Sequence, residues 1–263
     1  MSSPLAEQLT PEFLQSVRDF WYEHITEEHQ YVIPEMKQMM RWFTQSNEFD
    51  TACAAKFKPA LELIQSVSPT PSDLIEAANP QSPLDWMSLI VLLDQFPRNI
   101  YRGPAAKIPF TIFDPLSSSI TMTAISKGVD KDPSIRYRIA ARNWFYVPLT
   151  HQEDLAFQDR CVEESKRIGT MMAEMDESNI PPEDAPGGKD ARIMLKKMDE
   201  EVAQMMLKSS SEFSEKHRDI IKRFGRFPHR NGPLGRVTTP EEKKWLEEGG
   251  ETFSRRAEPE ETK

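Results

Sequence analysis

The sequence predicts an all-α protein built from antiparallel helical hairpins, and three observations support this. Helix-start signals, in which a capping side chain precedes a proline, recur along the chain. They occur at Thr10-Pro11, Ser82-Pro83, Asp114-Pro115, Asp132-Pro133 and Thr239-Pro240. Apolar residues between these signals repeat at helical spacing. No segment alternates apolar and polar residues as a strand does, so we expect no β-sheet.

Length and composition predict one large helical domain over about residues 9–253, with residues 1–8 and 254–263 disordered. The formal net charge of −9 argues against a nucleic-acid partner and against an anionic membrane surface. The N-terminal segment lacks the apolar run of a signal peptide, and the longest apolar run, Met87–Leu93, is too short to cross a bilayer. Two distant cysteines, Cys53 and Cys161, indicate a reducing compartment, so we expect a cytoplasmic protein.

The first helices are predicted after Thr10, over Glu35–Phe43, and over Asp50–Ile64 with an interruption near Pro59. Residues 66–82 hold several prolines and serines and predict a loop with at most a short helix.

A central helix is predicted to begin at Ser82, with Asp85 completing a favourable N-terminus. Residues 83–93 are apolar on almost every side, which is typical of a buried helix. Pro97 predicts a kink or a restart, and Gly103 ends the unit.

The second half of the chain predicts further helices over 116–127 and 134–145. Thr150 and Glu153 match a capping box for a helix over 151–175. A proline- and glycine-rich segment, about 176–190, is predicted to be mobile. A charged amphipathic helix should then reach Phe224 with an interruption around 209–211, before a final short helix after Thr239.

Polar side chains gather at the end of the central helix, where Asp94, Arg98 and Arg102 are spaced by four residues. Gln95 and Asn99 share that spacing, so a continuous helix would place them on one stripe. Two guanidinium groups on one side of a helix can clamp a carboxylate or a phosphate. A structural interpretation is equally open, in which Asp94 pairs with Arg98 and Arg102 neutralises the helix dipole.

A second group comprises His151, Glu153 and Asp154, in which a histidine stands beside two carboxylates. Such a set can perform acid–base catalysis near neutral pH. Helix capping accounts for Glu153 and Asp154 without any chemistry, but it does not account for His151.

A third group, Arg226, His229, Arg230 and Asn231, occupies a short loop after Phe224. In an acidic chain this cluster could attract a negatively charged group, since loops often carry functional residues. The alternative is a loop docked by salt bridges.

Several catalytic motifs are missing, including the nucleophile elbow, the Walker A loop, the dinucleotide-binding glycine motif and the paired-cysteine motif. His24 and His29 are five residues apart and lack the spacing of a helical zinc pair. We therefore expect neither a metal nor a cofactor.

Five sequence motifs occur together in this chain. They are WFTQSNEFD (42–50), LLDQFPRNIYRG (92–103), FYVPLTHQEDLAFQ (145–158), RFGRFPHRNGPLGR (223–236) and TPEEKKWLEEGG (239–250). In order and spacing the chain resembles the domain-of-unknown-function 924 family from about Leu9 to Phe253. The family's D-Q-F-x-R-N-x-Y-R-G, P-L-x-H-x-E-D-L and F-G-R-F-P-H-R-N motifs fall on residues 94–103, 148–155 and 224–231.

The resemblance implies a tetratricopeptide-like helical fold and no established general activity. Two departures from the family pattern are the stretch PAAKIPFTIFD after Gly103 and Gln152 in place of a typical serine. Residues 175–213 look like an insertion that the resemblance does not cover.

We expect the three polar segments to converge on a pocket for a small phosphate- or carboxylate-bearing ligand, at the mouth of the central helix. The expected ligand-binding residues are Asp94, Arg98, Asn99, Arg102, Arg226, His229, Arg230 and Asn231, and the expected catalytic residues are His151, Glu153 and Asp154. The reaction would be hydrolysis or group transfer. The alternative is a non-catalytic tetratricopeptide-like scaffold for a partner protein or peptide, in which the same network is structural.

Overall fold

The computed structural model describes residues 3–197, 200–253 and 256–257. The chain is helical, as predicted, and its only strands within these residues are β1 (Thr44–Gln45) and β2 (Arg256–Ala257), which pair in parallel. The helices are α1 (Pro4–Gln8), α2 (Pro11–Trp21), α3 (Glu28–Val32), α4 (Met36–Phe43), α5 (Asn47–Val67), α6 (Pro71–Ala78), α7 (Pro83–Ile100), α8 (Asp114–Ser126), α9 (Ile139–Arg142), α10 (Val147–Thr150), α11 (Leu155–Ala173), α12 (Gly188–Lys197), α13 (Glu200–Phe224) and α14 (Pro240–Glu247). Shorter helical turns are η1 (Gly103–Ala106), η2 (Pro109–Phe113), η3 (Val129–Lys131), η4 (Asn143–Phe145) and η5 (Pro228–Arg230).

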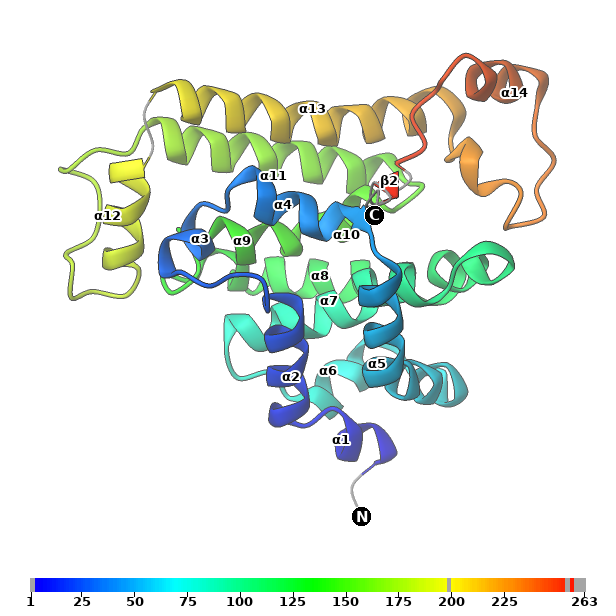
Figure 1. Cartoon of the computed structure of the whole chain (residues 1–263), viewed down its shortest axis with the longest axis horizontal. Coiled ribbons are helices and arrows are strands. Elements are labelled where there is room, and N and C mark those ends of the chain that lie inside the picture. Colours follow the sequence, from blue (N-terminus) through cyan, green and yellow to red (C-terminus); the bar gives the residue numbers. More distant parts are fainter. Residues whose placement is uncertain (1–2, 198–199, 254–255, 258–263) are drawn as a thin grey trace, which may run out of the picture.

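The helix α7 lies in the middle of the molecule and contacts α2, α5 and α8 (Figure 1). Every residue from Trp86 to Pro97 is buried, which confirms the predicted core helix. Its N-terminus is closed by the predicted capping box, in which Ser82 and Asp85 each accept the other's backbone N–H. On the far side of this core, α11 and α13 run antiparallel along each other (Figure 1).

Two internal prolines, Pro59 and Pro97, do not interrupt their helices. The interruption expected near Pro59 and the restart expected at Pro97 are therefore wrong, and a kink at Pro97 stays a prediction. The helix α5 runs without a break from Asn47 to Val67, and α7 continues to Ile100. A proline removes one backbone hydrogen bond, but buried residues on both sides of it, such as Phe57 and Leu61, anchor the helix by tertiary packing.

The predicted helix over 134–145 is wrong, because this stretch consists of turns, α9 and η4. Asp132 does not cap a helix; its side chain accepts the N–H of Ser134 at 2.9 Å and closes a local turn. The predicted interruption at 209–211 is also wrong, since α13 passes through these residues.

The ends of the chain differ from the predicted disorder. Residues 4–8 form α1, capped by Ser3, and Leu5 of this helix is buried in the main apolar core. Of the predicted tail, only Arg256 and Ala257 are described, and they form β2. Residues 176–187 form hydrogen-bonded turns, and their mobility stays a prediction.

None of the helices in the described ranges has the length and apolar character needed to span a membrane.

Candidate functional site

Asp114, the first residue of α8, continues a helical stretch that begins before it. After Gly103, the π-helical turn η2 leads directly into α8. π-Turns are rare and occur often at functional sites. Asp114 therefore has helical backbone angles (φ −58°, ψ −46°) and does not serve as the N-cap that its proline suggested. Its side chain is buried and faces α7 instead.

His151 lies between α10 and α11, and its neighbours do not form the predicted capping box. The hydroxyl of Thr150 donates to the carbonyl oxygen of Val147 at 2.7 Å. Asp154 caps α11 by accepting the N–H of Ala156 at 2.7 Å. The capping-box prediction is wrong because the chain enters α11 one turn later than expected, which leaves Glu153 free for another role.

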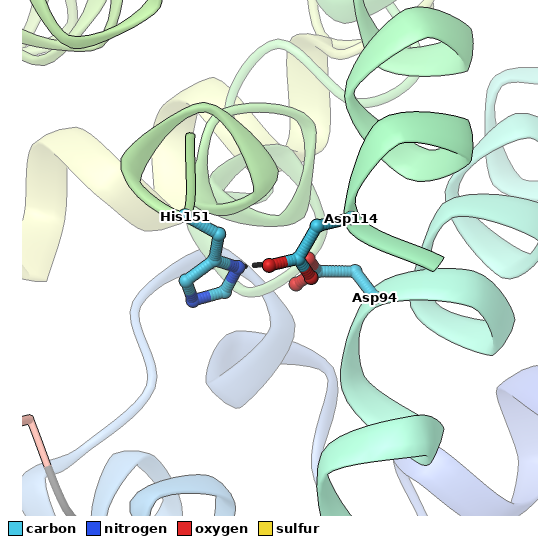
Figure 2. A group of neighbouring side chains, drawn as sticks. All are labelled: Asp94, Asp114 and His151. Atoms are coloured by element: carbon cyan, nitrogen blue, oxygen red, sulfur yellow. Dashed lines mark hydrogen bonds and ion pairs between the residues drawn. The ribbon is translucent and has the colours of Figure 1, made fainter. Parts of the chain in front are cut away.

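The carboxylate partner of His151 is Asp94, and not Glu153 or Asp154. Nδ1 of His151 lies 2.8 Å from Oδ1 of Asp94 (Figure 2). The other oxygen of Asp94 accepts a hydrogen bond of 2.6 Å from Nε2 of Gln95. Because an ionised carboxylate only accepts, His151 carries its proton on Nδ1. Its Nε2 points away from both carboxylates and has no hydrogen-bond partner among the described residues.

This environment holds His151 neutral and Asp94 ionised at pH 7. Burial and the charge of Arg98 lower the pKa of His151, although Asp94 acts in the opposite direction. Burial alone would raise the pKa of Asp94, but His151 and Arg98 outweigh it and lower this pKa to about 2. A neutral imidazole with a free Nε2 can act as a general base.

Two arginines from distant segments meet on Asp114. Nη2 of Arg98 lies 2.7 Å from Oδ1, and Nη1 of Arg230 lies 3.3 Å from Oδ2. Arg98 also approaches Oδ1 of Asp94 to 3.7 Å. Arg230 donates a further hydrogen bond of 2.9 Å to the carbonyl oxygen of His151. Arg98 and Arg230 therefore tie α7, α8, His151 and the loop after α13 together.

The two guanidinium groups differ in how well their charge is compensated. Burial lowers the pKa of Arg98, but Asp114 and Asp94 outweigh this and raise it. For Arg230, burial dominates and the pKa falls to about 10, with Arg98 adding to the effect. Nε of Arg230 is buried without a hydrogen-bond partner among the described residues, and its guanidinium lies between the rings of Phe110 and Phe227, 4.4 and 4.6 Å from their centroids.

His229 precedes Arg230 on η5 and is only partly buried. Its Nδ1 is enclosed and has no hydrogen-bond partner within the described ranges. Burial and the charge of Arg230 lower the pKa of His229 to about 4. His217 of α13 lies close to Phe227 and stacks on Phe253, with ring centroids 3.4 Å apart.

Glu153 holds the loop that carries Arg230. It accepts the N–H of Phe227 at 2.8 Å and forms a two-pronged ion pair with Arg236, at 2.9 and 2.7 Å. Its function in this structure is thus to fix the loop against the core.

Four of the expected ligand-binding residues have partners elsewhere. Arg102 pairs with Asp50 at 2.6 Å, and Arg226 pairs with Glu242 at 2.6 Å. Asn231 donates to Glu242 at 3.1 Å, and Asn99 donates to the carbonyl oxygen of Gln95 at 3.1 Å. The structure brings together Asp94, Arg98, His151 and Arg230, with His229 next to Arg230.

Sequence reasoning missed Asp114 and Arg236. The apolar stretch from Ile108 to Phe113 was a usable signal for Asp114, because a solvated loop before a helix cap is seldom so apolar. Arg236 closes the last motif of the family resemblance, and its position there was the available signal.

A metal ion fits this group poorly. Single ligand atoms of Asp94, Asp114 and His151 lie within 4.8 Å of one another, as a metal site requires. However, Arg98 and Arg230 already stand against Asp114, so a divalent cation would meet two positive charges at close range. Nε of Arg230 is a buried donor without a hydrogen-bond partner among the described residues, and such a donor favours an anion over a cation.

Comparisons with known proteins agree with the family resemblance. A solved structure titled "Structure of Protein of Unknown Function ATU0120 from Agrobacterium tumefaciens" is similar, with a TM-score of 0.59 and 28% identity, covering 90% of this chain and 98% of that chain. No curated protein matches. The family model described as "Bacterial protein of unknown function (DUF924)" matches residues 17–250, so the chain belongs to this family.

Proposed function

We propose that Asp94, His151, Arg98 and Arg230 form a site for a small anionic ligand bearing a carboxylate or a phosphate. We further propose that His151 acts there as a general base in hydrolysis or group transfer. The observation that carries the proposal is the contact of 2.8 Å between His151 Nδ1 and Asp94, which leaves Nε2 without a hydrogen-bond partner in the described part of the chain.

In this proposal each residue has a distinct task. Nε2 of His151 accepts a proton from water or from a substrate hydroxyl, and Asp94 stabilises the imidazolium that forms. Arg98 and Arg230 face the negative charge of the substrate. Asp114 orients the two arginines, and Glu153 fixes the loop that carries Arg230.

A second candidate is a non-catalytic, tetratricopeptide-like scaffold that binds a partner peptide. It is favoured by charge balance, because Arg98 and Arg230 already neutralise Asp94 and Asp114 without a ligand. Exposed apolar residues on α4, Met36, Met40 and Phe43, would then contact the peptide. For either function we propose a cytoplasmic location, which is supported by the low cysteine content: Cys53 and Cys161 are far apart in the sequence and indicate no disulfide framework.

A thermal-shift screen against carboxylates, phosphates and nucleotides separates the two candidates. An anion at ten times its Kd should raise Tm by roughly 3 °C. Arg230→Met should abolish this shift, whereas the matched variant Arg102→Met should keep it, because Arg102 has its own partner in Asp50. A hydrolysis assay with the stabilising compounds, in the wild type and in His151→Gln, then tests the general base. The absence of a shift with every anion would reject the site.

A further inference from the structure

We propose that the site binds a monoanionic carboxylate together with one proton, and that His229 takes up this proton. This inference rests on the proposed function and adds the charge of the ligand and a second proton-transfer residue.

The charge balance around Asp114 is the first argument. Two arginines and two aspartates meet there, so the cluster is neutral before any ligand arrives. A monoanion would leave one buried negative charge in excess, which is unfavourable in a low-dielectric environment. One added proton restores neutrality. A dianion would require two protons, so a singly charged carboxylate fits better than sulfate.

His229 is the histidine with free capacity for that proton. Its Nδ1 is enclosed without a partner, and it adjoins Arg230, whose Nε also lacks one. His151 also has an Nε2 that accepts no hydrogen bond from the described residues, but in the proposed function this nitrogen takes the proton of the substrate or water. His217 uses its Nδ1 on the carbonyl oxygen of Phe213 and is covered by the ring of Phe253.

The charges around His229 explain why binding and protonation are coupled. Arg230 on η5, Arg98 on α7, and His151 disfavour its protonation, and only Glu153 favours it. His217 of α13 also interacts with His229. An anion placed against Arg230 offsets the positive charge next to His229 and so raises the pKa of His229. By reciprocity, protonation of His229 tightens anion binding.

The test is an NMR titration of the five histidine rings against pH, with and without acetate, using the full chain. We expect saturating acetate to raise the pKa of His229 by about two units or more. The Kd of the acetate anion should rise about tenfold per pH unit between the free and the bound pKa of His229 and level off above the bound value. His29 serves as an internal control, because it lies on α3 at the opposite end of the molecule (Figure 1). His229→Gln should bind acetate with no dependence on pH between 5 and 7.

Three results would overturn the inference. Acetate binding without a change at His229, or with an unchanged pH dependence in His229→Gln, rejects the proton uptake but leaves the proposed function intact. Sulfate binding as tightly as acetate rejects the monoanion preference. The failure of every anion to bind rejects both this inference and the proposed function.

Discussion

The contacts of Arg102 with Asp50 and of Arg98 and Arg230 with Asp114 are arranged differently. Arg102 pairs one-to-one with Asp50, and its side chain is 33% exposed. Arg98 and Arg230 share Asp114 and are 15% and 7% exposed. The one-to-one pair sets one positive charge against one negative charge at a partly exposed position, whereas Asp114 is shared by two guanidinium groups. Nε of Arg230 is buried and has no hydrogen-bond partner among the described residues. The sequence predicts Arg98, Arg102 and Arg230 as ligand-binding residues. In our account only the arginines that share Asp114 keep that role.

The largest expected difference concerns the two aspartates. Asp114→Ala should lower the free energy of unfolding by about 3–5 kcal/mol, because it leaves two buried guanidinium groups without their common partner. Asp50→Ala should cost about 1 kcal/mol or less, since Arg102 can turn to solvent. Urea denaturation at pH 7 measures both, and equal losses would remove the distinction between the two regions.

The second expected effect is a loss of stability at acidic pH, caused by the buried His217. Burial lowers the pKa of His217 to about 3. Because this folded-state pKa lies below the unfolded value near 6.5, the unfolded chain binds the proton first, and stability falls as the pH decreases from 6.5 towards 3. His217 alone should contribute a loss of about 3 kcal/mol at pH 4, and His217→Phe should remove this contribution while preserving the ring contacts. His229, whose pKa is about 4, contributes separately and should keep its share in this variant. Denaturation midpoints between pH 7 and pH 4 provide the test.

The smallest expected effect concerns the loop that delivers Arg230. Glu153→Gln should weaken the Arg236 pair and cost about 1–2 kcal/mol. Amide exchange at Phe227 should accelerate, since its N–H donates to Glu153. The matched variant Glu241→Gln affects the exposed pair with Arg223 and should have no measurable effect. Unchanged exchange at Phe227 in Glu153→Gln would show that other contacts hold the loop.

The fold was largely predictable because helix capping and apolar periodicity are local properties. The helices predicted to start after Ser82 and Thr239 formed as expected, each with a capping box, since the chain enters them from a loop. Asp114 and Thr150 carried the same pattern but did not cap, because the preceding chain was already helical. The sequence cannot encode that difference locally, since it depends on how far the previous turn continues.

The candidate site was predictable in its segments but not in its pairs. Arg98, His151 and Arg230 come from the three segments that the sequence singled out. Which carboxylate pairs with His151 depends on how α7 packs against the connection between α10 and α11, and that geometry is a tertiary property. For this reason Asp94, and not Glu153, orients the imidazole.

The most direct test of an anion site at Arg230 is the free energy of unfolding of Arg230→Met, measured with and without saturating acetate. Our account predicts a loss of about 3 kcal/mol without acetate, because Asp94 and Asp114 then keep only Arg98 and one buried negative charge is left in excess, although methionine fills the space next to Phe110 and Phe227. It also predicts the complete loss of the stabilisation that acetate gives the wild type. The same loss together with no acetate effect on the wild type would contradict it and identify Arg230 as a purely structural residue.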